Sequence, residues 1–119
     1  MYEREWLFRV ENIVNAIEKI QRILSQTSHD EFINDDDKWN IVAFQLIVIG
    51  EAAKLIPEEI RNRYSELPWR DMIDVRNRMA HDYLNVNLNI VWKLAMEDLP
   101  PLIEPLKRIY KDFDNLQSN

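Results

Sequence analysis

The chain has 119 residues, 46% hydrophobic and 30% charged, which is the composition of a folded globular protein and excludes a disordered one. This length supports one hydrophobic core, so we expect a single domain over residues 1–119. No apolar run approaches the roughly 20 residues that span a bilayer. The absence of cysteine excludes disulfides and thiolate metal sites, and a net charge of −6 disfavours broad, sequence-independent binding to nucleic acid.

The first residues show no signal-peptide pattern, so we expect a cytoplasmic protein.

A single glycine leaves little material for hairpin turns, and helical periodicity predominates instead. In the first segment apolar residues recur at alternating four- and three-residue steps, namely Trp6, Val10, Ile13, Ile17, Ile20 and Leu24. This spacing predicts a helix of about five turns with a bundle-type seam, and residues 25–28 predict a break after it.

A second long helix is predicted over residues 39–56, preceded by three aspartates at 35–37. One aspartate is expected to cap the helix, and capping explains the three carboxylates better than a hard-metal site does. The helix is apolar nearly all round, which indicates burial on more than one side, and one such side is often a subunit interface. Gly50 inside it costs about 1 kcal/mol relative to alanine, and close approach of another helix would explain its presence.

The remaining helices are predicted from proline positions and apolar spacing. A short helix covers residues 57–64, and another runs from Pro68 to about residue 81 or 83. A helix follows over residues 88–99, and prolines separate it from a last amphipathic helix over residues 102–113. The predicted fold class is therefore all-α, an up-and-down helical bundle of four to five helices.

The end of the helix that starts at Pro68 gathers the residue types of a phosphate-handling site: Arg76, Asn77, Arg78, His81 and Tyr83. A histidine titrates near neutrality and can shuttle a proton, arginines can neutralise an oxyanion, and an asparagine can orient either group. A histidine at a helix C-terminus also interacts favourably with the helix dipole. The cluster can therefore be a catalytic site or a satisfied helix end.

On a helical wheel Arg76 lies in the middle of the apolar face. Burying a guanidinium there is unfavourable unless it is paired, and Glu51, equally out of place on the apolar helix, is the natural partner. Asn77 and His81 are four residues apart and can touch. His81 lies about 140° from Arg76, so these side chains do not converge on one straight helix. A helix end, another helix or a second subunit must complete the site.

Residues 76–83 resemble the signature of the HEPN superfamily. That signature is an arginine and a histidine separated by four residues, the first of which is polar. A tyrosine two residues after the histidine, here Tyr83, resembles the narrower HepT-type toxins of bacterial and archaeal HepT/MntA toxin–antitoxin pairs. The similarity extends along most of the chain, through Ile49-Gly50-Glu51-Ala52, Leu67-Pro68-Trp69 and Val91-Trp92.

The resemblance implies a helical bundle that forms a homodimer, so that two motifs face one cleft. It also implies a metal-independent endoribonuclease without a cofactor. His81 would act as general base or acid when an RNA 2′-hydroxyl attacks the adjacent phosphate to give a cyclic phosphate. Arg76 would stabilise the developing charge and Asn77 would orient His81 or the phosphate, with Glu51 and Arg78 in support.

The same resemblance implies a partner, a minimal nucleotidyltransferase antitoxin that adenylylates the motif tyrosine. Carried over to this chain, the modified residue would be Tyr83. Two alternatives stay open. The chain could be a non-catalytic nucleotide- or substrate-binding partner of a nucleotidyltransferase, or a dimeric structural protein in which Arg76 and Glu51 form a buried pair. The intact Tyr83 favours the nuclease over the binding module.

Overall fold

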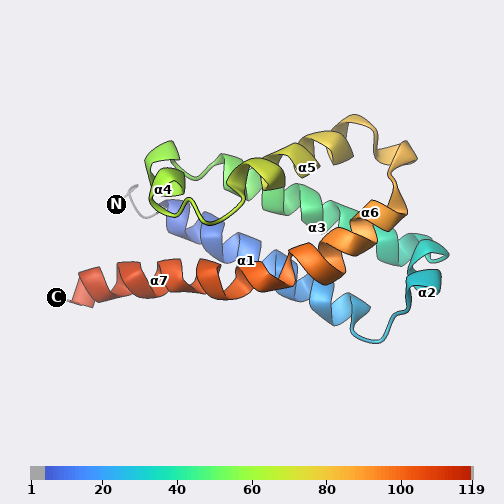
Figure 1. The fold of residues 1–119 in the computed structure, drawn as a ribbon, viewed down its shortest axis with the longest axis horizontal. Coiled ribbons are helices and arrows are strands. Elements are labelled where there is room, and N and C mark those ends of the chain that lie inside the picture. Colours follow the sequence, from blue (N-terminus) through green and yellow to red (C-terminus); the bar gives the residue numbers. More distant parts are fainter. Residues whose placement is uncertain (1–4, 119) are drawn as a thin grey trace.

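The computed structural model describes the backbone of residues 5–118 and the side chains of residues 5–113. Regular secondary structure in this part of the chain is helical throughout, in the order α1 (Glu5–Leu24), α2 (His29–Ile33), α3 (Asp36–Lys54), α4 (Glu58–Arg63), α5 (Trp69–His81), the 3-10 turn η2 (Tyr83–Asn85), α6 (Leu88–Lys93), the π-helix η3 (Leu94–Asp98), the 3-10 turn η4 (Pro100–Leu102) and α7 (Ile103–Ser118). The four long helices α1, α3, α5 and α7 run in alternating directions (Figure 1). The all-α, up-and-down bundle expected from the sequence is confirmed.

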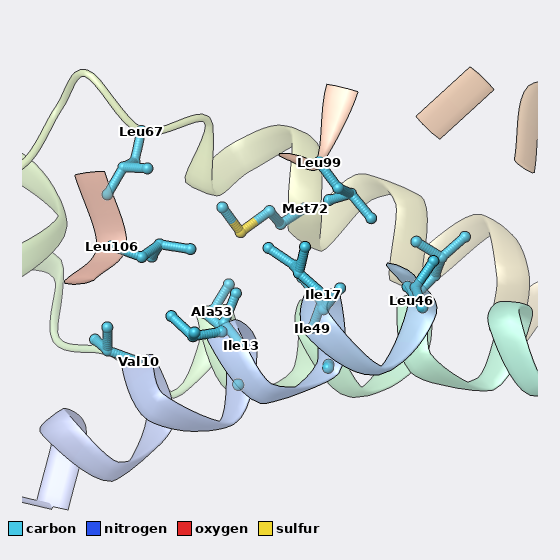
Figure 2. Packing of buried hydrophobic residues seen from close by; sticks show 14 of the residues in the cluster. Val10, Ile13, Ile17, Leu46, Ile49, Ala53, Leu67, Met72, Leu99 and Leu106 are labelled. Carbon is cyan, nitrogen blue, oxygen red and sulfur yellow. The ribbon is translucent and has the colours of Figure 1, made fainter. Parts of the chain in front are cut away.

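The core lies where α1 packs on α3, with α5 on the other side of α3 and α7 along α1 (Figure 1). The predicted seam of α1 is confirmed, because all six of its apolar residues are buried. Figure 2 shows side chains of the four long helices meeting there: Val10, Ile13 and Ile17 of α1, Leu46, Ile49 and Ala53 of α3, Met72 of α5 and Leu106 of α7. Helix α3 is the central element, since it packs against both α1 and α5.

The helix ends follow from capping side chains. Asp35 caps α3, its carboxylate accepting a hydrogen bond from the backbone N–H of Lys38 at 3.1 Å, as the capping interpretation predicted. The short helix α2 was not expected, although its start carries a recognisable signal. Ser28 and Glu31 form a reciprocal capping box, a Ser-x-x-Glu pattern that is readable in the sequence.

Gly50 lies where α3 and α5 are closest. A Cβ atom placed on Gly50 would lie 2.1 Å from the Cβ of Arg76 and 2.7 Å from the carbonyl oxygen of Met72. No side chain fits in that space, which confirms that close helix approach explains the glycine. Gly50 therefore brings the backbone of α3 directly against the residue that opens the motif.

The predicted helix over residues 88–99 is a single α-helix only as far as Lys93. The chain continues as a π-helix in which the N–H of Leu99 bonds to the carbonyl of Leu94 at 2.9 Å, and then as a 3-10 turn from Pro100. Proline lacks the backbone donor that an α-helix needs, so the prolines divert the hydrogen-bond pattern. In the described part of the chain, no helix is long and apolar enough to cross a membrane.

Candidate functional site

The close packing of α3 on α5 brings Glu51 and Arg76 together. The Arg76 Nε lies 2.5 Å from the Glu51 Oε1, and both of these atoms are buried. The rest of each side chain reaches solvent, with 30% of Arg76 and 47% of Glu51 exposed. The structure thus contains the ion pair that the wheel pointed to, at the edge of the core instead of deep within it.

Asn77 joins this pair on the same helix. The Nη1 of Arg76 donates a hydrogen bond to the Asn77 side-chain oxygen at 3.1 Å. Because Glu51 holds Nε and Asn77 holds Nη1, the guanidinium is fixed in place before any ligand arrives. Its charge is offset by the Glu51 carboxylate, and a phosphate would share the guanidinium with that carboxylate.

His81 is the last residue of α5 and its side chain is exposed. Within the described residues, neither a hydrogen bond nor an ion pair holds the imidazole, and none joins it to Asn77. The helix is regular from Trp69 to His81, so Arg76 and His81 stay on different faces, as the wheel predicted. Among the described residues, no hydrogen bond or ion pair joins Arg76 to His81.

Tyr83 lies beyond the end of α5, in the turn η2, so the helix ends at the earlier of the two predicted positions, residue 81. Its hydroxyl donates to Asn40 of α3, at 2.7 Å from the side-chain oxygen and 3.2 Å from the carbonyl oxygen. Its ring packs on Trp39, with 5.8 Å between the ring centroids. Burial raises the pKa of Tyr83 above its ordinary value.

Arg78 faces a different part of the molecule. It lines a groove of about 630 Å³ whose apolar floor comes from α3, α5 and the segment that follows α6. Four carboxylates line the same groove, namely Asp71, Asp74, Glu97 and Asp98. The structure therefore separates Arg78 from Arg76 and gives it acidic neighbours.

Sequence reasoning missed two residues of the site, Trp39 and Asn40. Asn40 is a polar residue inside the most apolar helix of the chain, which is the signal that could have singled it out. Its importance depends on a contact with Tyr83, 43 positions away, and no spacing rule reaches that far. Among the described side chains, no three of the types His, Cys, Asp and Glu gather as a metal site would require.

A helical bundle that presents an Arg-Asn-x-x-x-His-x-Tyr motif at the end of α5 belongs to the class of HEPN domains, as the comparisons with known proteins bear out. The chain belongs to the ribonuclease HepT-like family, whose profile matches residues 13–109. It is 31% identical to the "Putative RNase MJ0127" of Methanocaldococcus jannaschii, over 91% of this chain and 89% of that protein. It is 32% identical to the "Probable ribonuclease HepT" of Thermococcus cleftensis, over 86% of this chain and 93% of that protein. No solved structure is significantly similar to it.

Proposed function

We propose that this chain is a metal-independent endoribonuclease, the toxin of a toxin–antitoxin pair. The observation that carries the proposal is the motif of Arg76, Asn77, His81 and Tyr83 in a member of the ribonuclease HepT-like family. Its geometry supports the proposal, because Arg76 is oriented by Glu51 and Asn77 and still reaches solvent, and His81 is exposed. A cation that is fixed in advance is suited to a charge that develops only during reaction.

The proposed reaction is transfer of a phosphodiester within RNA. The 2′-hydroxyl oxygen attacks the adjacent phosphorus, the bond from phosphorus to the 5′-oxygen breaks, and a 2′,3′-cyclic phosphate remains. One proton leaves the 2′-hydroxyl and one reaches the departing 5′-oxygen, and His81 is the group suited to moving them. Arg76 stabilises the negative charge on the phosphate oxygens, and Asn77 orients the phosphate.

A homodimer would supply the convergence that one chain lacks. Helix α3 and its C-cap residue Leu55 carry an exposed apolar stripe. Ile41, Phe44 and Leu55 are 41%, 58% and 56% exposed, with the half-exposed Val48 between them. Glu51 lies on the same face, because residues 41, 44, 48, 51 and 55 follow heptad-like steps. A second copy docked on the stripe would face two Arg76–Glu51 pairs across one cleft and place two copies of His81 near it.

The proposed antitoxin is a minimal nucleotidyltransferase that adenylylates Tyr83. An attached nucleotide would add bulk and negative charge two residues from His81, where RNA phosphates must enter. Both effects oppose substrate binding, because like charges repel and the cleft is filled. The position of Tyr83 directly after α5 supports this assignment.

The test is RNA cleavage by purified protein in excess chelator, with the native chain compared with His81→Ala. Removing a general acid or base costs about 10²- to 10⁴-fold, so the rate should fall at least about 100-fold. His29 is the only other histidine and provides a matched control, since His29→Ala should cleave at the native rate. Cleavage that persists in His81→Ala, or that the chelator abolishes, would contradict the mechanism.

A second candidate function is nucleotide binding without cleavage. It is favoured by the Glu51 carboxylate, which already offsets the charge of Arg76, and by the acidic net charge of −6. Under this function the chain would bind RNA or a nucleotide in a way that Arg76→Ala weakens, and it would release no cyclic phosphate. Analysis of the RNA ends after incubation with the protein separates the two functions, because only cleavage gives a 2′,3′-cyclic phosphate end.

A further inference from the structure

Two residues near the start of α3 hold Tyr83, namely Trp39 and Asn40, which we call the α3 clasp. Asn40 accepts the Tyr83 hydroxyl with two oxygens, at 2.7 Å and 3.2 Å. Trp39 covers the ring, tilted by 37° at a centroid distance of 5.8 Å. Tyr83 is half-buried as a result, although it belongs to a short turn on the surface.

The clasp is itself held in a fixed orientation by Asp36. The side-chain nitrogen of Asn40 donates to the Asp36 carbonyl oxygen at 2.6 Å, and the indole nitrogen of Trp39 donates to the Asp36 carboxylate at 3.1 Å. Since the amide nitrogen of Asn40 is engaged, its oxygen faces Tyr83. The clasp therefore presents the acceptor oxygens of Asn40 to the Tyr83 hydroxyl.

We propose that the α3 clasp shields the hydroxyl of unmodified Tyr83, and that a nucleotide can be attached only when the Tyr83–Asn85 turn has left the clasp. This inference rests on the proposed modification of Tyr83. In that step the phenolic oxygen attacks the α-phosphorus of a nucleoside triphosphate, the bond to pyrophosphate breaks, and the phenol proton passes to a base. Within the clasp that proton is already donated to the two oxygens of Asn40, so the phenol must leave the clasp before a base can take the proton.

The modified tyrosine cannot return to the clasp. Its oxygen no longer carries a proton to donate, and the anionic phosphate oxygens would face the two acceptor oxygens of Asn40. The turn then stays open. Because only Asp82 separates His81 from Tyr83, the open turn also frees the end of α5. Modification therefore acts on the placement of His81 as well as on access to the cleft.

The experiment uses N-acetylimidazole, which transfers an acetyl group to an accessible phenolic oxygen, and follows each tyrosine by peptide mass spectrometry. A side-chain hydrogen bond of this kind shifts an opening equilibrium by about three- to tenfold. Acetylation of Tyr83 should therefore be about three- to tenfold faster in Asn40→Ala than in the native chain. The matched control is Asn15→Ala, an exposed asparagine on α1, which should leave the Tyr83 rate unchanged. Tyr64 reports any global loosening, because its rate should be the same in all three proteins.

Hydrogen exchange of residues 82–87 provides a second measurement that does not depend on reactivity. Exchange should be faster in Asn40→Ala, in Tyr83→Phe and in the acetylated native chain than in the unmodified native chain. Tyr83→Phe keeps the ring and removes only the hydroxyl, so it tests the clasp even if Asn40→Ala folds poorly. Equal acetylation of Tyr83 in the native chain and Asn40→Ala, or unchanged exchange in Tyr83→Phe, would overturn the clasp.

The enzymatic arm uses a minimal nucleotidyltransferase and ATP. Asn40→Ala should accept the nucleotide faster than the native chain by the same factor as in the acetylation. If the native chain neither cleaves RNA nor accepts a nucleotide, the proposed function fails, and acetylation and exchange still decide whether the clasp exists. If it does both and Asn40→Ala is modified at the native rate, the clasp fails and the proposed function stands.

Discussion

At the scale of residues, the site depends on an arginine that would be unfavourable in its position without a carboxylate. Glu51 and Arg76 meet through buried atoms while much of each side chain stays in solvent. Removing one partner of such a pair costs more than the pair itself contributes, because a charge is then left buried without compensation. Its main effect is to fix the guanidinium, and the same contact serves the structural and the catalytic interpretations.

Arg76→Met should lower the free energy of unfolding by about 1–3 kcal/mol, because the buried Glu51 oxygen loses its ion-pair partner. Adding Glu51→Gln should recover at least half of the loss, since the unpaired charge is then removed. Chemical denaturation of the two variants measures both effects. Arg70→Met, an exposed arginine on the same helix, is the control and should change stability by less than about 0.5 kcal/mol. An unchanged melting temperature in Arg76→Met alone would rule out a stabilising pair.

At the scale of elements, the contact of α3 with α5 positions the motif, and Gly50 sets its distance. In a free helix Gly50→Ala would be favourable by about 1 kcal/mol. Here the added Cβ would lie 2.1 Å from the Arg76 Cβ, so the helices must separate, and we expect a net destabilisation of about 2 kcal/mol. Thermal unfolding measures the change, with Lys54→Ala on the exposed side of α3 as the control. A variant as stable as the native chain would show that the helices are not in such close contact.

At the scale of the whole molecule, the proposed homodimer predicts that the stripe on α3 is the dimer interface. Phe44→Glu should raise the dimer dissociation constant at least about thirtyfold, which corresponds to loss of about 2 kcal/mol at an interface centre. Sedimentation measures this, and RNA cleavage per chain should fall with the dimer fraction. Phe8→Glu is the matched control, because Phe8 is equally exposed, at 65% against 58%, and lies on α1. Dimers that persist in Phe44→Glu would place the interface elsewhere.

Much of the fold was readable from local patterns. The seam of α1, the Asp35 cap and the reason for Gly50 were all predicted, because each depends on residues within a few turns of one another or on a backbone rule. The π-helix and the path of the Tyr83 turn were not. They depend on how the proline segment and the end of α5 pack against other helices, and the periodicity of apolar residues does not encode that packing.

By itself the sequence determined the helical bundle, the motif and the pairing of two charged residues that could not be buried alone. Only the tertiary structure decided which motif residues share a neighbourhood. Arg76 forms an ion pair with Glu51 and a hydrogen bond with Asn77. Arg78 lines an acidic groove, and the Tyr83 hydroxyl donates a hydrogen bond to Asn40. The physical reason is that residue spacing fixes the angle around one helix. Which side chain meets another across helices depends on their packing distance, here set by Gly50, and on where each helix ends.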